Sequence, residues 1–299
     1  MDAAQPPRIA RTRLADPLER LYSTFDHVTS ATDPVHLVRP FASAEDREVA
    51  AFCAAALAFG RVASVMHSIG ALFAVLGPRP AAFVRDFDAR RDGEALRPLV
   101  HRWIRGDDVV ALLLVLQRML REAGSIEGFF AAGDDPSAPD VAPGLEAFST
   151  RALETDLAAA YSPRRAGPPR RHGVAYFFSR PSAGSACKRL NLFLRWMVRR
   201  DAIDFGLWTR VTPGRLVIPL DTHTVRVGRC LRLTTYRTPD WRMAAQITAA
   251  LRRIDPADPV RYDFSLCHLS MMGACGDGRP QRDAHCPLKG VCQPKLRRP

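Results

Sequence analysis

The strongest constraint on the fold is a long apolar stretch, REVAAFCAAALAFGRVASVMHSIGALFAVLG, at residues 47–77. Its apolar residues recur at intervals of three and four, and its β-branched residues do not cluster, which is the pattern of amphipathic helices. SAED at 43–46 supplies a capping signal just before the stretch, and Gly60 interrupts it. The stretch therefore predicts two packed helices with a break near Gly60.

Other segments share this helical periodicity. VVALLLVLQRMLREAG, from Val109, is apolar nearly all round, which predicts a central helix. GSIEGFF and LEAFSTRALETDLAAAY predict two more helices, and LADPLERLYSTF predicts a short one near the N-terminus. No segment alternates apolar and polar residues over strand length, so we expect an all-α fold built as a two-lobed helical bundle.

Breaks in the pattern divide the chain into five parts. They are an N-terminal arm with a short helix at 1–40, a helical lobe at 41–161, an Arg- and Pro-rich loop at 162–173, a second helical lobe at 174–272 and a Cys-rich segment at 273–299. The N-terminus lacks the apolar region of a signal peptide, and no run approaches the 18 apolar residues of a membrane span. We expect a cytoplasmic, monomeric protein that makes no contact with membranes and keeps its seven cysteines reduced.

The charge balance is strongly basic, with 43 Lys plus Arg against 31 Asp plus Glu and a net charge of +12. Such an excess indicates a polyanionic partner, of which nucleic acid is the commonest, although codon bias toward arginine is an alternative explanation. Only three of the basic residues are lysines, and Lys188 is the only lysine in the first 288 residues. A position that needed only positive charge would more often carry arginine in this chain, so Lys188 is a candidate for amine chemistry.

Lys188 lies in SACKRLNLFLRWMVRR, residues 185–200, which has the periodicity of a helix. On a helical wheel, Lys188, Arg195 and Arg199 fall on the side opposite an apolar stripe formed by Leu190, Phe193, Leu194, Met197 and Val198. This pattern predicts a basic face with Lys188 at its N-terminal end. A row of solvated charges without a function is the alternative.

A carboxylate follows in VIPLDTHTVRVGRCLRL, residues 217–233. Asp221 comes after Pro219 and occupies the N-cap position of a new helix, and helix capping alone would account for it. An amine and a carboxylate at two helix starts could also act together on a sugar carbon. The amine would be the nucleophile and the carboxylate would accept its proton.

The residues around Lys188 and Asp221 resemble the helix-hairpin-helix DNA glycosylases, the superfamily of endonuclease III-type enzymes and 8-oxoguanine glycosylases. Gly184-Ser185-Ala186-Cys187-Lys188 is similar to the family's hairpin G-x-G-x-K, with alanine in place of the second glycine. Leu220-Asp221-Thr222-His223-Thr224-Val225-Arg226-Val227 is similar to its block V-D-T-H-x-x-R-V. The run from Lys188 to Arg195 looks most like archaeal 8-oxoguanine glycosylases. With DPADPVRYDF at 255–264, it also looks like an uncharacterised bacterial family of the same superfamily.

The resemblance implies a base-excision enzyme that acts on double-stranded DNA with a damaged base, expected to be an oxidised one, and also cleaves abasic sites. Lys188 would form a Schiff base with the deoxyribose, and Asp221 would assist it. The segment 174–272 would be the catalytic lobe. DNA contacts are expected from a set of residues in the hairpin, the two helices and the loop 162–173: Gly184, Ser185, Ala186, Arg195, Arg199, His223, Arg226, Arg164, Arg165, Arg170 and Arg171.

Two features leave alternatives open. Phe205 and Trp208, in an insert between Lys188 and Asp221, could line a base pocket or pack in the core. Cys286 and Cys292 have the spacing of the last two cluster ligands in endonuclease III-type enzymes, and Cys275 precedes them. Cys267 or His285 could complete the set, which would then hold a [4Fe–4S] cluster or zinc, or the segment could hold no metal.

Two other functions compete with the glycosylase. A DNA-binding protein without catalysis would keep the basic surface but would not need the Lys188 and Asp221 pair. An RNA-binding protein related to tRNA metabolism would be consistent with the charge alone.

Overall fold

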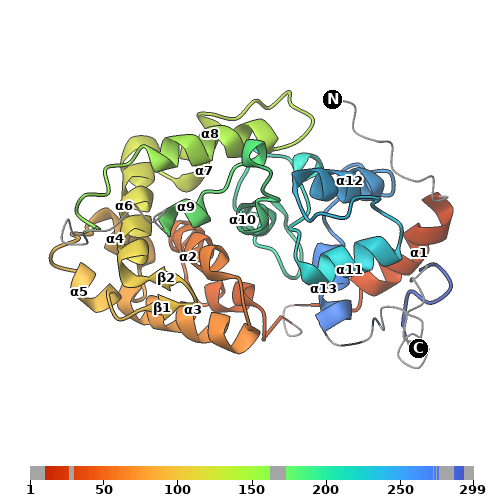
Figure 1. Cartoon of the computed structure of the whole chain (residues 1–299), viewed down its shortest axis with the longest axis horizontal. Coiled ribbons are helices and arrows are strands. Elements are labelled where there is room, and N and C mark those ends of the chain that lie inside the picture. The colour runs from red at the N-terminus through yellow and green to blue at the C-terminus, as the bar shows by residue number, and fades with distance from the viewer. Residues whose placement is uncertain are drawn as a thin grey trace.

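The computed structural model describes residues 11–26, 30–161, 173–271, 273, 275 and 286–292. Figure 1 shows two groups of helices, with helix α10 (Lys188–Val198) between them. The group on the left contains most of the chain before α10, and the group on the right contains the later helices together with the N-terminal helix α1 (Arg11–Tyr22). The described residues are therefore mostly helical, as the sequence predicts.

The left-hand group holds eight α-helices within the described part of the chain. They are α2 (Ala44–Leu57), α3 (Val62–Leu76), α4 (Pro80–Arg85), α5 (Gly93–Leu96), α6 (Gly106–Ala123), α7 (Ile126–Ala131), α8 (Ala142–Leu153) and α9 (Val174–Phe177). The right-hand group adds α11 (Thr222–Cys230), α12 (Trp241–Arg252) and α13 (Asp263–Met271) to α1. Three short 3-10 helices lie between them in the described ranges: η1 (Pro34–Val38), η2 (Pro181–Ala183) and η3 (Pro213–Arg215).

The predicted break at Gly60 is confirmed. Ser43 caps α2 by accepting a hydrogen bond from the Asp46 amide, and α2 ends at Leu57. Gly60 then has a positive φ of 106°, which glycine adopts without strain, and α3 begins two residues later. Helix α6 is buried along most of its length, as its apolar sequence predicts.

A small hairpin was not predicted from the sequence. Strands β1 (Val100–His101) and β2 (Ile104–Arg105) pair in antiparallel fashion and are only two residues long, too short for any alternating pattern to show. Arg102 and Trp103 form the turn, and Arg102 has a positive φ of 56°. No helix among the described residues is long and apolar enough to span a membrane.

The structure does not have the exposed basic face that the sequence predicts for α10. Arg195 and Arg199 do share one side of the helix, but they are only 3% and 2% exposed. Arg195 forms ion pairs with Asp263 at 2.6 Å and with Asp204 at 3.2 Å. The predicted DNA contacts of Arg195 and Arg199 are therefore wrong, because buried carboxylates occupy both guanidinium groups.

Arg199 extends this buried network. It forms ion pairs with Asp258 at 2.8 Å and Asp201 at 2.9 Å, and it also pairs with Asp204. Since Asp263 is the first residue of α13, the network joins α10 to the right-hand group of helices. The loop that follows α10 supplies Asp201 and Asp204, so the same network also fixes the chain where it leaves the helix.

We predict that Arg195→Met lowers the free energy of unfolding by about 3–5 kcal/mol, because it leaves the buried Asp263 without its ion-pair partner. Chemical denaturation followed by circular dichroism measures this change. Arg121→Met, at an exposed position in the last turn of α6, is the control and should change stability by less than about 0.5 kcal/mol. Equal effects of the two substitutions would contradict a structural role for the network.

Candidate active site

Lys188 is the first residue of α10, and the turn before it has an unusual backbone. Gly184 and Cys187 have positive φ angles of 76° and 48°. The Cys187 amide donates a hydrogen bond to Ser185 Oγ at 3.1 Å, and Asn191 Nδ2 donates to the Ala186 carbonyl at 3.1 Å. These bonds hold the turn against α10, and a glycine at 184 accommodates its left-handed conformation.

The Lys188 amine points toward the end of α2. Its Nζ donates a hydrogen bond to the Ala58 carbonyl at 2.8 Å, and the residue is half-buried. Ala58 is the C-cap residue of α2, so this carbonyl lies at the end of the helix, where backbone carbonyls have no amide partner within the helix. The amine is thus anchored between two helices that are far apart in the sequence.

Asp221 both caps a helix and faces a pocket. Its Oδ1 accepts hydrogen bonds from the amides of His223 at 2.9 Å and Thr224 at 2.7 Å, which caps α11 as predicted. Its Oδ2 accepts a hydrogen bond from Cys267 Sγ at 3.3 Å. Because the two oxygens have different partners, the capping and pocket-facing interpretations of Asp221 are compatible.

The pKa of Asp221 is lowered from its ordinary value although the residue is half-buried. Burial raises this pKa, while the Lys188 charge, the Thr224 amide and the Cys267 thiol lower it, and the lowering effects prevail. Asp221 is therefore ionised at neutral pH. Burial and the Asp221 charge raise the pKa of Cys267 well above its ordinary value, so Cys267 is a protonated thiol that donates rather than a nucleophile.

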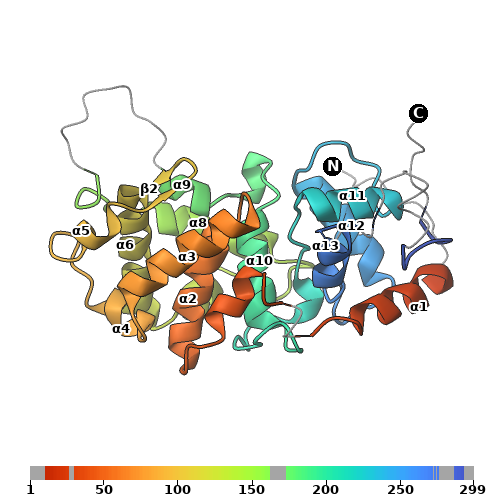
Figure 2. The same cartoon turned by 90° about the horizontal axis from the view of Figure 1, so that it is seen from below.

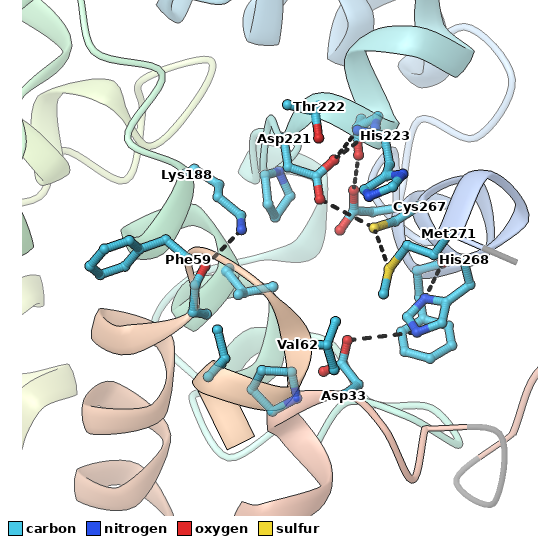
Figure 3. Close-up of a pocket in the computed structure, with 18 of the residues that line it drawn as sticks. Asp33, Phe59, Val62, Lys188, Asp221, Thr222, His223, Cys267, His268 and Met271 are labelled. Carbon is cyan, nitrogen blue, oxygen red and sulfur yellow. Dashed lines mark hydrogen bonds and ion pairs between the residues drawn. The ribbon is translucent and has the colours of Figure 1, made fainter. Parts of the chain in front are cut away.

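Lys188 and Asp221 line one pocket of about 310 Å³, a size in the range of small-ligand sites. Figure 3 shows its side chains, which come from both helical groups: Phe59 and Val62 border α2 and α3, whereas His223, Cys267 and Met271 belong to α11 and α13. The pocket therefore brings the predicted amine and carboxylate together, along with Phe59, Val62 and Met271, which the sequence analysis did not single out.

One side of the pocket carries a histidine and a second carboxylate. His268 stacks on Phe264 with ring centroids 3.7 Å apart, and its Nε2 lies 3.8 Å from Asp33 Oδ2. Burial lowers the pKa of His268, so the imidazole is neutral near pH 7. A bound ligand would thus meet an ammonium and a carboxylate on one side, and an imidazole beside a second carboxylate on the other.

The remaining predicted contact residues are dispersed. Gly184 is exposed, Ser185 and Ala186 are half-buried in the turn before α10, His223 lines the pocket and Arg226 is exposed on α11. The predicted contacts Arg164, Arg165, Arg170 and Arg171 lie outside the described residues, as does His285.

Phe205 and Trp208 do not line the pocket that contains Lys188. Trp208 is 5% exposed, its Nε1 donates to Glu48 at 2.7 Å, and its ring packs on Phe193. Phe205 is half-buried, with the guanidinium group of Arg39 5.4 Å from its ring centre. The base-pocket prediction is therefore wrong for Trp208, for which the alternative of core packing holds, and Phe205 lies outside the Lys188 pocket.

The candidate metal-binding cysteines lie in two different regions of the structure. Cys267 lies in the pocket, hydrogen-bonded to Asp221, whereas Cys230, at the end of α11, has side-chain hydrogen bonds with Cys275 and Cys292. Cys275 and Cys286 are buried in the same hydrophobic core, against which Cys292 packs. Among the residues that the structure describes, no group of three or more His, Cys, Asp or Glu side chains could hold a metal ion as it stands.

Sequence reasoning missed Asp33, Phe59, Val62 and His268, which line the pocket, and Cys230, which contacts the later cysteines. The pocket residues lie in segments with no chemical motif, and only the packing of α2 and α3 against α10 and α13 brings them together. Cys230 lies in the segment that begins with Asp221. Nothing in its position along that helix indicates contacts with the C-terminal cysteines.

Comparisons with known proteins identify a family. Neither the curated proteins nor the solved structures gave a significant match. A family profile described as "Protein of unknown function (DUF2400)" matches residues 33–272, which include both lobes and every residue of the pocket. The chain therefore belongs to the DUF2400 family.

Proposed function

We propose that this protein is a DNA glycosylase with associated lyase activity at abasic sites, with a fold of the helix-hairpin-helix glycosylase type. The observation that carries the proposal is the presence of a lysine amine and an ionised carboxylate in one ligand-sized pocket. Lys188 is the only lysine in the first 288 residues, and the motif resemblance around Lys188 and Asp221 supports the same reaction. The substrate class is duplex DNA with an oxidised base such as 8-oxoguanine.

The proposed reaction begins at the Lys188 amine. Asp221 accepts a proton from Nζ, which then attacks C1′ of the nucleotide in the pocket and displaces the base. Opening of the sugar ring gives a Schiff base between Nζ and C1′. Loss of the C2′ proton then breaks the C3′–O bond and cleaves the strand. Arginine could not replace Lys188, because a guanidinium stays protonated and forms no imine.

The remaining features suit a DNA substrate. The net charge of +12 favours a polyanion, and the turn at Gly184, Ser185 and Ala186 together with Arg226 could contact the phosphates on either side of the nucleotide. His268 and Asp33, on the other side of the pocket, offer polar groups for the edge of a base. A protein that binds DNA without catalysis is the competing function, and the experiments below separate the two.

Borohydride reduction should trap a covalent complex between the protein and duplex DNA that contains an abasic site or 8-oxoguanine. Lys188→Gln should abolish trapping, since no other pocket residue can form an imine. Lys289→Gln is the matched control, because Lys289 is an exposed lysine outside the pocket, and it should trap like the wild type. Trapping that persists in Lys188→Gln would rule out the proposed nucleophile.

Asp221→Asn should lower the rate of strand cleavage at abasic sites by about 10²- to 10⁴-fold, the usual effect of losing a general base. Asparagine is a good N-cap residue, so the substitution removes the charge but keeps α11 capped, and the unfolding midpoint should change little. A nicking assay with matched protein concentrations measures the rate. Equal nicking by both proteins, or no nicking by a wild type that binds DNA, would favour the non-catalytic alternative.

The predicted cofactor concerns the C-terminal cysteines. Thiolates are the donors that an iron–sulfur cluster or a structural zinc requires. Cys275, Cys286 and Cys292 are the expected ligands, and the contacts of Cys230 with two of them make Cys230 a better fourth candidate than Cys267. Because the described side chains do not form a metal site as they stand, the cofactor remains a prediction and enters no step of the proposed reaction.

Metal analysis and visible absorption of protein purified without oxygen test this prediction. If the C-terminal cysteines bind iron or zinc, Cys230→Ser should lower the metal content, because Cys230 contacts Cys275 and Cys292. Cys267→Ser is the control and should retain the metal, because Cys267 lies in the pocket with Asp221. Wild-type protein that is folded and free of iron and zinc would show the prediction to be wrong, and loss of metal only in Cys267→Ser would reverse the choice of ligand.

A further inference from the structure

An exposed tryptophan lies beside the pocket. Trp103, in the turn of the β1–β2 hairpin, is 50% exposed. Of the protein's other tryptophans, Trp196 and Trp208 are buried and Trp241 is half-buried. A single exposed aromatic residue is common on protein surfaces, so the neighbours of Trp103 decide whether it has a role.

The Trp103 ring is held firmly on one side. Its centroid lies 4.9 Å from that of Phe59 and 5.0 Å from that of Tyr176. Phe59 and Tyr176 also contact each other, with centroids 5.0 Å apart, so the three rings form one cluster between the hairpin, the end of α2 and α9. Figure 2 shows β2 next to α9. The cluster fixes the orientation of the indole and leaves half of it exposed.

The hairpin is joined to the pocket through the loop between α2 and α3. Phe59 and Gly60 line the pocket, and the preceding residue, Ala58, accepts the hydrogen bond from Lys188. A Cβ atom at Gly60 would lie only 3.1 Å from Cδ of Arg102, so the Arg102 side chain packs directly on this loop. The exposed indole therefore contacts Phe59, a residue that lines the same pocket as the Lys188 amine.

One arginine lies beside the indole, and a second is exposed on the neighbouring loop between α2 and α3. Arg61 and Arg102 are exposed, and the Arg102 guanidinium carbon lies 5.3 Å from the centre of the Trp103 ring. Val62, which follows Arg61 and lines the pocket, is 38% exposed. We call Arg61, Val62, Arg102 and Trp103 the Trp103 rim. An exposed aromatic face with flanking arginines is the combination by which proteins stack on nucleobases while binding the adjacent phosphates.

We propose that the Trp103 rim binds duplex DNA, with the indole stacking on a nucleobase next to the nucleotide that enters the pocket. The identity of that nucleotide rests on the proposed function, whereas the stacking contact does not. A nucleotide that leaves the duplex exposes the faces of its former neighbours, and a rigid aromatic side chain at the pocket edge can cover one of them. Arg61 and Arg102 would bind the phosphates on either side.

Titration of the protein with a duplex that contains a stable abasic-site analogue tests the contact through tryptophan fluorescence. The DNA should quench wild-type emission, and Trp103→Phe should remove most of this quenching, because Trp196 and Trp208 are buried. Trp103→Ala should weaken binding by about 5- to 150-fold, the range for loss of one base-stacking aromatic. Trp103→Phe should bind more tightly than Trp103→Ala, since phenylalanine still stacks.

Two controls separate the rim from general effects. Trp241→Phe should keep the quenching, because Trp241 lies on α12 in the other helical group. Val100→Ser changes an exposed residue of the same hairpin outside the rim and should bind DNA like the wild type. Quenching that persists in Trp103→Phe, or wild-type affinity in Trp103→Ala, would overturn the proposal. RNA of the same sequence that binds as tightly as the DNA would overturn the choice of partner.

The same titration with Lys188→Gln distinguishes this inference from the proposed function. If DNA quenches Lys188→Gln as it does the wild type but borohydride traps neither protein, the stacking contact holds and the glycosylase reaction fails. If the wild type is trapped while its fluorescence does not respond to DNA, the reaction holds and the Trp103 contact fails.

Discussion

The structure depends on a buried network of two arginines and four aspartates around α10. Arg195 and Arg199 pair with carboxylates from the loop after α10, from the segment before α13 and from the first residue of α13. Burying so many charges contributes little net stability, because desolvation offsets most of the attraction. The network instead determines geometry, because only one relative position of α10 and α13 satisfies all of its ion pairs. The network therefore fixes the right-hand helices against the helix that begins with Lys188.

That geometry reaches the pocket through Asp263. Thr224 Oγ1 lies 3.5 Å from Asp263 Oδ1, which links the network to the first turn of α11, where Asp221 is the cap. The pKa of Asp263 is raised to about 6, because burial and the nearby Asp221 charge raise it by more than Arg195 lowers it. Asp263 is thus a second carboxylate near Asp221 beside the pocket, and the guanidinium of Arg195 offsets its negative charge. Without Arg195, two carboxylates would compete for ionisation near the Lys188 amine.

Much of the helical framework could be predicted from the sequence, and so could Lys188 and Asp221 as candidate site residues, which both line the pocket. Capping at Ser43, the break at Gly60 and the N-cap at Asp221 are local features, decided within a few residues of chain. The helical wheel was also right that Arg195 and Arg199 share a side of α10. It was wrong about their environment, because a wheel shows which residues lie together and not what covers them. The aspartates that cover them lie on both sides of Asp221 in the sequence, where no local pattern identifies them as partners.

The lysine at position 188 has a physical explanation in this environment even before its chemistry is considered. Its nitrogen has one anchoring acceptor, the Ala58 carbonyl, and a carboxylate that acts on it through charge. A guanidinium presents five donors in a fixed plane and would leave several of them without acceptors in a half-buried position, whereas an ammonium can rotate to suit one carbonyl. Arginine fits the network around Asp204 and Asp263, where carboxylate oxygens converge from several directions. The single lysine in an arginine-rich region therefore marks the place where this chain has a pocket in place of a packed ion-pair network.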